Sequence, residues 1–458
     1  MGRLPRRDFI ETAATLGTVV GLGARRRWLP PVADVAIVGG GLSGLVAAAE
    51  LTGRGAEVVV LEAKTRVGGR TLNQALPGGA VVDAGGQWVG PTQDAVLALA
   101  EQLAVPTFKT YTGRAEGTLD DSAAFSVEML GVVGEFQSSM TTLPIEAPWS
   151  APRAAEWDAL TIADWIASRK LGPATIGRLR TAVSATLGGS LDQVSFLCWL
   201  SHLRSAGGFR MVEGVEGAAR ERRLVGGAQR LSLALAERLG PKVLLGSPVG
   251  RIIQKADRVE IRTRVAIIEA RRVIVAMSPL DASRIEFLPA LPADRQELMA
   301  QWKLAPGYKA HLVYPTPFWR AAGFNAISVG AAKARLTFDS SPPEGGPGVI
   351  VVFGDRAALP RNKSQRQAAL TEDLVSTFGS AVLRPTAFFE QDWSEDPWNG
   401  GCASPLSPGL LSKVGASLRR PVDRIHWAGT ETSERWNGYL DGAVRAGQRA
   451  AGEVLAAL

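Results

Sequence analysis

Short apolar runs and helical spacing alternate near the start of the chain. Residues 34–38 read Asp-Val-Ala-Ile-Val and predict a buried parallel strand, and residues 57–61 predict a second one. Between them, the apolar spacing from Leu45 to Leu51 predicts a helix that ends near Gly53. A strand, a helix and a second strand within about thirty residues are typical of a βαβ unit with a parallel sheet.

A glycine-rich turn follows the first predicted strand directly. Gly39, Gly41 and Gly44 have the spacing G-x-G-x-x-G, and Glu62 follows the second strand. Gly39 permits a tight turn, Gly41 lets the backbone approach a pyrophosphate, and Gly44 lets the helix pack closely on the sheet. Phosphates would bind the free N–H groups of this helix N-terminus, and Glu62 is placed to accept hydrogen bonds from a ribose. The pattern predicts a dinucleotide site but does not separate FAD from NAD.

Composition narrows the class of protein. The 458 residues are 46% hydrophobic and 21% charged, which predicts a globular chain of two domains. The net charge of +7 owes much to six arginines within residues 1–27, and no basic stripe is interleaved with aromatics, which argues against a nucleic-acid partner. Three histidines and two cysteines, without H-x-x-x-H or C-x-x-C spacing, argue against a metal site.

The first 32 residues are patterned as a leader. Arg6 and Arg7 precede a weakly apolar stretch, residues 13–22, which looks like a twin-arginine (Tat) export signal and is too short for an ordinary transmembrane helix. No other segment is a candidate membrane span. No clear A-x-A cleavage site follows, and residues 25–27 are all arginine. The expected location is the periplasm or cell surface, or the cytoplasm if the leader is not functional.

A second glycine doublet identifies the cofactor. Residues 66–70, Arg-Val-Gly-Gly-Arg, resemble the R-x-G-G-R element of the large FAD family that includes amine oxidases, protoporphyrinogen oxidases and carotenoid desaturases. A Gly-Gly pair lets the backbone pass close to a long cofactor. The resemblance narrows to the flavin monoamine oxidases over most of residues 33–455. The matching segments are VDAGGQWVGPTQ (82–93), APW and EWD (147–149, 156–158), LVGGAQRL (224–231) and HWAGTETSERWNGYLDGAVRAGQRAA (426–451).

The resemblance implies an α/β fold, in which a Rossmann-like FAD-binding domain is interleaved with an α+β substrate domain of mixed sheet and helices. The FAD-binding domain is expected to comprise residues 33–110, 221–300 and 391–458, with a strand at 272–277. The substrate domain is expected to comprise residues 111–220 and 301–390, with the apolar run 349–353. The helix from Gly442 onward is expected to direct its positive N-terminus at the pyrimidine end of the flavin.

The glycine loop and the resemblance together imply the residues that bind FAD. They are Gly39, Gly41, Ser43, Gly44, Glu62, Arg66, Gly69, Arg70, Gly86, Gln87, Val249, Cys402, Gly429, Thr430, Glu431 and Tyr439.

Three residues are the candidates nearest the chemistry. Lys309 aligns with the family lysine that holds a water against flavin N5, and Tyr439 aligns with one wall of the family's aromatic cage. Ala403 replaces the aromatic residue expected at the second wall, so Trp88 or Trp398 would have to compensate. This departure leaves the class of amine open.

The cysteines and histidines have alternative interpretations. Cys402 aligns with the cysteine that carries the flavin through an 8α thioether in the animal enzymes, but the alternative is a small buried thiol. Cys198 is expected in an apolar helix core. None of His202, His311 and His426 is an obvious acid–base catalyst, although His311 shares a strand face with Lys309.

The predicted activity is FAD-dependent oxidation of a small-molecule amine to an imine, then to an aldehyde or ketone, with O2 reduced to H2O2. One alternative is an L-amino-acid oxidase, or another flavin oxidoreductase of the same superfamily. An amino-acid oxidase needs an arginine for the carboxylate, and none is evident in the matched active-site segments, although Arg204 and Arg210 fall in the substrate domain. A non-catalytic flavoprotein is a third alternative, against which Lys309 and Tyr439 argue. Homodimer and monomer both stay open.

Overall fold

The computed structural model describes residues 32–113 and 126–458. The predicted export leader lies outside these residues, apart from its last position, and stays a prediction. Within the described part of the chain, no helix combines the length and the apolar character needed to cross a membrane.

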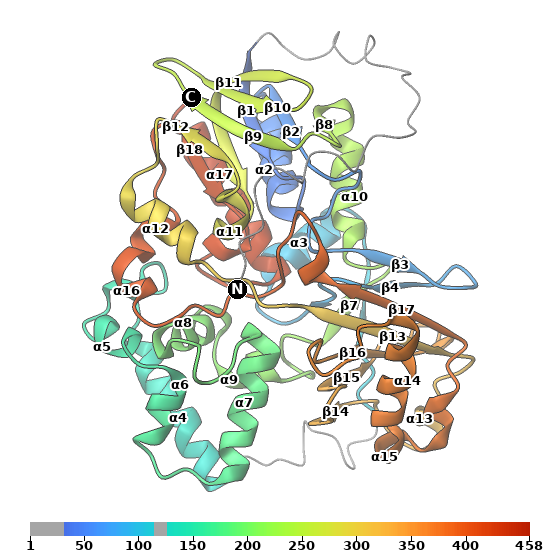
Figure 1. The fold of residues 1–458 in the computed structure, drawn as a ribbon. Coiled ribbons are helices and arrows are strands. Elements are labelled where there is room, and N and C mark those ends of the chain that lie inside the picture. Colours follow the sequence, from blue (N-terminus) through green and yellow to red (C-terminus); the bar gives the residue numbers. More distant parts are fainter. Residues whose placement is uncertain (1–31, 114–125) are drawn as a thin grey trace.

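The N-terminal strand β1 (Ala33–Val38) lies inside an eight-stranded sheet (Figure 1). It pairs in parallel with β2 (Val58–Leu61) and with β11 (Ile267–Ala276), and β11 pairs in parallel with β18 (Ile425–Ala428). Every residue of β2 and β18 is buried, as expected for parallel strands covered on both faces. The other strands are β8 (Val243–Leu244), β9 (Val249–Gln254), β10 (Val259–Thr263) and β12 (Glu286–Leu288). The predicted α/β fold is confirmed.

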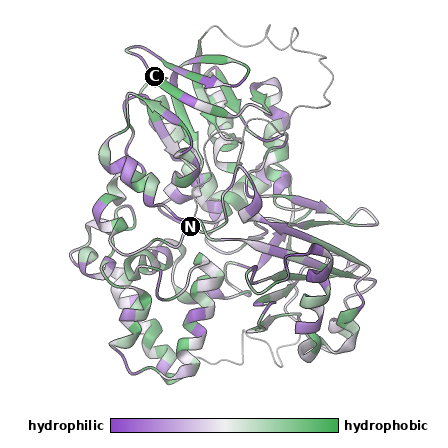
Figure 2. Cartoon of the chain, in the orientation of Figure 1, coloured by the Kyte–Doolittle hydropathy of each residue, from purple (hydrophilic) through white to green (hydrophobic). Residues whose placement is uncertain are grey.

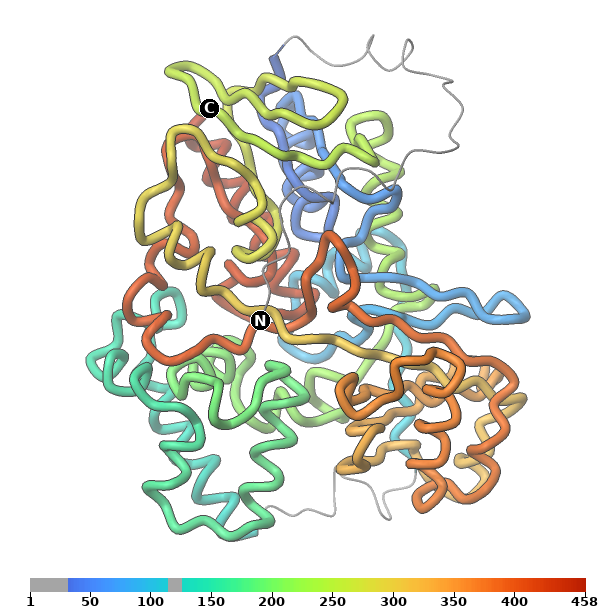
Figure 3. Tube along the Cα trace, viewed as in Figure 1, coloured from blue at the N-terminus to red at the C-terminus, as the bar shows by residue number. Residues whose placement is uncertain are grey.

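Four helices cover one face of this sheet and bury a single apolar cluster against it. They are α2 (Leu42–Gly53), α3 (Asp94–Gln102), α10 (Gln229–Leu239) and α17 (Leu440–Leu455). The other face buries a second apolar cluster, which includes residues of β9 and β10 from the same sheet and of the region of α11 (Pro279–Ala282) and α12 (Ala293–Gln301). Figure 3 shows the blue, yellow-green and red parts of the chain meeting in this unit, and Figure 2 shows the hydrophobic colouring of its inner strands.

A second, antiparallel sheet has the strand order β14-β15-β16-β13-β17. Its central strand β13 (Tyr308–Tyr314) is buried throughout, and its side chains alternate between two environments. Tyr308, Ala310, Leu312 and Tyr314 pack in one cluster under α13 (Phe318–Ala321) and α14 (Lys363–Asp373). The odd-numbered residues of β13 therefore face the FAD-binding unit. The other strands are β14 (Ser328–Val329), β15 (Leu336–Asp339), β16 (Gly348–Phe353) and β17 (Ala387–Asp392).

A helical part of the molecule lies beside this sheet, at the lower left of Figure 1. Its core joins Phe136, Trp165, Phe196 and Trp199, whose rings contact one another. Cys198 is buried in the same cluster. The helices are α4 (Val127–Thr141), α5 (Ala154–Asp158), α6 (Ile162–Ala167), α7 (Pro173–Leu187), α8 (Phe196–Ala206) and α9 (Phe209–Glu213).

Small strands of the predicted FAD-binding domain lie next to the second sheet. The strand β5 (Trp88–Val89) pairs with β7 (Arg222–Leu224), which also pairs with β6 (Thr107–Lys109). A hairpin of β3 (Asn73–Ala75) and β4 (Val81–Asp83) packs through Leu76 and Val82 against the second sheet. The predicted domain boundaries stay a prediction; β17 continues two residues past the boundary placed at 390.

Helices α2 and α17 pack closely enough to require glycine at Gly447. A Cβ there would lie 2.4 Å from the carbonyl oxygen of Ser43, whereas a Cβ on Gly452, in the same helix, would meet no atom within 4 Å. We expect Gly447→Ala to lower the melting temperature, by a destabilisation of about 1–3 kcal/mol. Gly452→Ala is the matched control and should leave the melting temperature unchanged or raise it, because alanine favours a helix by about 1 kcal/mol over glycine. Equal melting temperatures for the two variants would contradict this packing argument.

Candidate active site

The first glycine loop lies where β1 enters α2. Gly39 has a φ of +111°, and a Cβ on it would lie 2.7 Å from the carbonyl oxygen of Ala276. The backbone N–H of Gly40 donates to Glu62 Oε2 over 2.6 Å, and the N–H of Lys64 donates to Glu62 Oε1 over 2.8 Å. Burial raises the pKa of Glu62, and the two backbone donors oppose that shift. Glu62 is therefore held rigidly at the carboxyl end of β2.

The second glycine doublet packs on the first loop, backbone against backbone. The N–H of Gly68 donates to the carbonyl oxygen of Gly40 over 2.9 Å, and a Cβ on Gly69 would lie 3.3 Å from the Cα of Gly41. Arg66 donates to three loop carbonyls, those of residues 67, 69 and 71. Arg66 thus supports the loop from behind, and it does not line the cavity described next.

A cavity of about 420 Å³ runs from the glycine loops to the helical part of the molecule. Most of the predicted cofactor residues line it: Gly39, Gly41, Ser43, Glu62, Gly69, Arg70, Gly86, Gln87, Val249, Cys402, Gly429, Thr430, Glu431 and Tyr439. Gly44 does not, because it packs under the loop, where a Cβ would lie 2.0 Å from the carbonyl oxygen of Gly39. The structure therefore separates residues that face the cavity from those that shape its walls.

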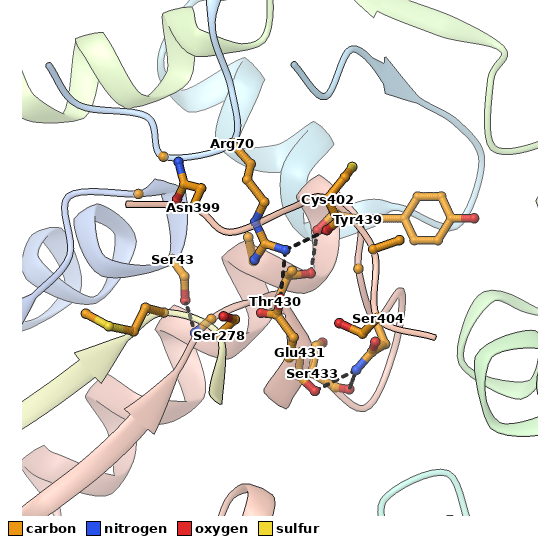
Figure 4. A pocket seen from close by; sticks show the side chains of 18 of the residues that line it. Ser43, Arg70, Ser278, Asn399, Cys402, Ser404, Thr430, Glu431, Ser433 and Tyr439 are labelled. Atoms are coloured by element: carbon orange, nitrogen blue, oxygen red, sulfur yellow. Dashed lines mark hydrogen bonds and ion pairs between the residues drawn. The ribbon is translucent and has the colours of Figure 1, made fainter. Parts of the chain in front are cut away.

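Arg70 joins the N-terminal and C-terminal parts of this cavity (Figure 4). Its Nη1 lies 2.7 Å from Glu431 Oε1 and donates to the carbonyl oxygen of Cys402 over 2.9 Å. Burial disfavours the charge of Arg70, but the ion pair with Glu431 outweighs it and raises the pKa of Arg70. Glu431 is 1% exposed, so Arg70 is what compensates its charge.

The features of this cavity fit a dinucleotide cofactor. Helices α2 and α17 both begin at it, and neither the Gly41 nor the Tyr439 N-cap is satisfied by a side-chain hydrogen bond. Free N–H groups and the positive end of a helix favour phosphate or another anionic group. The Oγ of Ser43 accepts a hydrogen bond from the N–H of Gly429 over 3.0 Å, which ties the two helix entries together.

Tyr439 lies on the wall of the cavity next to the C-terminal helix. Its ring contacts Trp436, with ring centroids 4.9 Å apart, and His202, with centroids 5.7 Å apart. Burial raises the pKa of Tyr439 to about 12, and the nearby Arg220 opposes the shift. The phenol is therefore neutral and presents its ring to the cavity wall.

Lys309 lies behind the cavity wall and does not line the cavity itself. Its Nζ donates to the carbonyl oxygen of Gly85 over 2.8 Å and to Gln87 Oε1, and Gln87 does line the cavity. Burial lowers the pKa of Lys309, and the carboxylate of Asp83 opposes this shift. The Nζ also lies 5.8 Å from the ring centroid of Trp88, which lines the cavity.

Cys402 and Ala403 belong to an extended segment that is fixed by backbone pairing. The N–H of Cys402 donates to the carbonyl oxygen of Ala305, and the N–H of Ala305 donates to the carbonyl oxygen of Ala403. The side chain of Cys402 is open to the cavity. Burial raises the pKa of its thiol, while Arg70 and Lys309 oppose the shift. Trp398 also lines the cavity.

The three histidines differ in their surroundings. His202 lines the cavity, and burial lowers its pKa to about 4, so it is neutral near pH 7. His311 is buried on the Lys309 face of β13, and burial lowers its pKa well below the usual value. His426 lies on β18, where its Nδ1 is 3.3 Å from Glu453. None of them is placed as a charged general acid in the cavity.

Sequence reasoning missed Arg220. We expected no arginine in the matched active-site segments, but Arg220 lines the cavity close to Tyr439 and Trp88. The available signal was its place four residues before LVGGAQRL, the segment that leads back to the flavin-binding unit. Arg204 and Arg210, the two arginines singled out from the sequence, do not line the cavity.

Comparisons with known proteins agree with this geometry. Residues 42–455 match the family described as flavin containing amine oxidoreductase. A protein of Mycobacterium tuberculosis named as a flavin-containing monoamine oxidase is 37% identical over 447 residues, covering 94% of this chain and 98% of its own. Amine oxidase [flavin-containing] B of Homo sapiens is 34% identical over 458 residues, covering 93% and 86%.

Solved structures are similar over the same range. Cyclohexylamine oxidase from Brevibacterium oxydans has a TM-score of 0.87 at 31% identity, covering 93% of this chain and 99% of that one. Wild-type putrescine oxidase bound to putrescine has a TM-score of 0.86 at 31% identity, with the same coverage. Cyclohexylamine and putrescine differ in charge when protonated, because putrescine is a diamine.

The Arg70–Glu431 pair can be tested through bound cofactor. In Arg70→Met, the buried Glu431 loses its cation, a change that costs about 3–5 kcal/mol for a buried ion pair. We therefore expect a reduced flavin absorbance per mole of purified protein and a lower melting temperature. Arg54→Met, at an exposed arginine that follows α2, is the control and should bind the cofactor normally. Full cofactor content in Arg70→Met would show that the pair is not needed.

Proposed function

The chain belongs to the flavin containing amine oxidoreductase family, and on this basis we propose the roles of its residues in flavin-dependent amine oxidation. FAD bound in the cavity would supply the acceptor for the hydride that leaves the amine. Loss of that hydride turns the amine into an imine, which water hydrolyses to an aldehyde or ketone. The observation that carries the proposal is that Tyr439, Trp88, Cys402 and the Lys309–Gln87 pair converge on one cavity.

Tyr439 is proposed to orient the substrate amine. Its ring is held by Trp436 and His202, so it presents one fixed face. The electron-rich face of an aromatic ring attracts the N–H groups of an amine. Ala403 has no aromatic ring that could face Tyr439, so we propose Trp88 as the second aromatic wall of the substrate cavity. No strong base is required for hydride loss from a neutral amine, in keeping with a neutral His202.

Lys309 is proposed to hold a water near the reacting centre and to assist reoxidation by O2, with release of H2O2. Burial lowers the pKa of Lys309 to about 7, and in its protonated form the side chain has three donors, of which Gly85 and Gln87 use two. The third donor is available for a water. A cation here also favours the negative charge that forms when O2 accepts electrons. A homodimer stays a prediction.

The Lys309→Met variant distinguishes the reduction of flavin by the amine from its reoxidation by O2. We expect the anaerobic reduction of bound flavin by an amine to persist within a few-fold, while reoxidation by O2 slows by about tenfold or more, because the cation is lost. Stopped-flow absorbance measures both rates. Lys303→Met, at an exposed lysine on the same segment, is the control and should match the parent. Unchanged reoxidation in Lys309→Met would refute the assigned role.

We also propose that Cys402 carries the flavin covalently, through its Sγ and the 8α carbon of the ring. Its opening to the cavity supports this, and Arg70 and Lys309 oppose the rise in the pKa of its thiol that burial causes. Forming the S–C bond would break the S–H bond of Cys402 and one C–H bond of the 8α methyl group, with release of two protons and two electrons; FAD would accept the electrons and O2 would remove them. The apoprotein therefore needs only FAD and O2 for attachment.

Acid precipitation tests the covalent bond. The parent protein should keep its yellow colour in the acid pellet, and Cys402→Ala should release it to the supernatant, because no sulfur remains to hold the ring. Cys198→Ala is the matched control, because Cys198 also borders the cavity but belongs to the helical core, where burial raises the pKa of its thiol to about 12. Release of the flavin from the parent protein would show that FAD is bound without a bond.

A further inference from the structure

Helix α8 turns one polar face toward the cavity. Apart from Arg204, the residues on its other sides are apolar and belong to the helical core. The residues of α8 that line the cavity are Cys198, Ser201, His202 and Ser205. Their spacing of three, one and three positions places them on the same side of a helix. A helix that otherwise serves the core therefore presents two hydroxyl groups and an imidazole to the substrate end of the cavity.

Two of these polar groups have no partner in the described part of the chain. The Oγ of Ser201 and the Nε2 of His202 are buried, and neither takes part in a hydrogen bond there. The Oγ of Ser205 differs, because it donates to the carbonyl oxygen of His202 over 2.8 Å. A buried polar atom without a partner is unfavourable, so a bound group that supplies the missing hydrogen bond is held more tightly than a hydrocarbon of the same size.

The imidazole of His202 is fixed beside the ring that is proposed to orient the amine. Its centroid lies 5.7 Å from that of Tyr439 and 6.5 Å from that of Trp199, whose plane is inclined to it by only 8°. His202 is 7% exposed, and burial lowers its pKa to about 4, so the ring is neutral near pH 7. A neutral imidazole has one N–H donor and one acceptor nitrogen, which match a hydroxyl group, since a hydroxyl also donates and accepts.

The unpartnered groups on α8 are ones that the proposed reaction does not use. Gln87 and Trp88 also carry unpartnered nitrogen atoms, but both lie next to Lys309, where the proposed reaction gives each of them a role. Apolar residues, among them Ala403 and Leu406, line the cavity as well. A ligand that matches this lining has a largely apolar body with a polar group at the place that faces α8.

We propose that Ser201 and His202 are specificity-determining residues, which favour amines whose body carries a neutral hydrogen-bonding group such as a hydroxyl. The inference rests on the proposed function and refines its substrate class. A hydroxyl that enters an apolar site without a partner lowers kcat/KM by about tenfold, because it loses its hydrogen bonds to water. A site whose own polar groups wait for a partner reverses that order, because the hydrocarbon analogue then leaves them unpaired.

Pairs of amines of nearly equal size test the preference. In each pair, a terminal hydroxyl of an amino alcohol replaces the methyl group of an alkylamine. The pairs are 3-aminopropanol with butylamine, 4-aminobutanol with pentylamine, and 5-aminopentanol with hexylamine. With the flavin-loaded parent enzyme, kcat/KM for the amino alcohol should equal or exceed that for the alkylamine in at least one pair. If every amino alcohol has the lower kcat/KM, the proposal is wrong.

Variants then assign the preference to α8. His202→Phe keeps a flat ring beside Tyr439 but removes both nitrogen atoms, and Ser201→Ala removes the hydroxyl. In the double variant, the ratio of kcat/KM for the preferred amino alcohol to that for its alkylamine should fall by about tenfold. Ser205→Ala, on the same face of α8, is the matched control and should keep the parent ratio, because that hydroxyl already bonds a backbone carbonyl. Each ratio is taken within one variant, so a general loss of activity does not affect it.

The remaining outcomes separate this inference from the function on which it rests. If amines reduce the flavin but the double variant keeps the parent ratio, amine oxidation stands and the inference fails. If His202→Phe lowers kcat/KM equally for both members of a pair, the imidazole acts on the amine group they share, which also overturns the proposal. If no amine reduces the flavin, the proposed function fails, and calorimetry with the same pairs still shows whether the amino alcohol binds more tightly, as the inference requires.

Discussion

The buried ion pair between Arg70 and Glu431 is the contact on which the cofactor cavity depends. The pair connects the second glycine loop, near the N-terminus, to the segment that precedes α17. Arg70 also donates to the carbonyl oxygen of Cys402, which connects the loop to the extended segment that carries the thiol. A buried carboxylate without a cation is strongly unfavourable, so each partner requires the other. Three distant parts of the chain are therefore joined at this pair.

Close backbone contacts place this pair accurately. Gly68 bonds to Gly40, Gly69 touches Gly41, and Gly447 lets α17 pack against α2. A Cβ on Gly447 would lie 2.4 Å from the carbonyl oxygen of Ser43, and a Cβ on Gly69 would lie 3.3 Å from the Cα of Gly41. Because the N-termini of α2 and α17 then face the same cavity, their N–H groups and dipoles act together on an anionic cofactor.

The electrostatics of the cavity divide it into two functional regions. Paired charges such as Arg70–Glu431 and Arg284–Asp281 line the cavity on the cofactor side, whereas Tyr439 and His202 contribute a neutral phenol and a neutral imidazole. Lys309 lies behind the wall between them, with its ammonium held by Gly85 and Gln87. A neutral amine is the form that such a region receives most easily, and it is also the form that can release hydride.

Local pattern was enough to predict much of this protein. The run 34–38 became β1, the helix after it became α2, and the glycine spacing marked the turn between them, because a tight phosphate-binding turn needs these residue types in this order. The doublet at Gly68-Gly69 and the C-terminal segment identified a flavin by resemblance. The strand predicted at 272–277 is longer in the structure, where β11 begins at Ile267, since its first half pairs with β10 rather than with β18.

Tertiary structure decided which side chains meet. The alternation along β13 puts Lys309 on the inner face, but only Gly85 and Gln87, which lie between β4 and β5 and far away in sequence, determine what its side-chain nitrogen contacts. Arg66 and Gly44 support the loop instead of facing the cavity, and Arg220 faces the cavity although no motif marked it. A sequence pattern reflects what the backbone requires locally: residues that allow a turn, the periodicity of a helix or strand, and small residues where two segments pack closely. The partner of a charged side chain depends on contacts between distant segments, which exist only once the chain has folded.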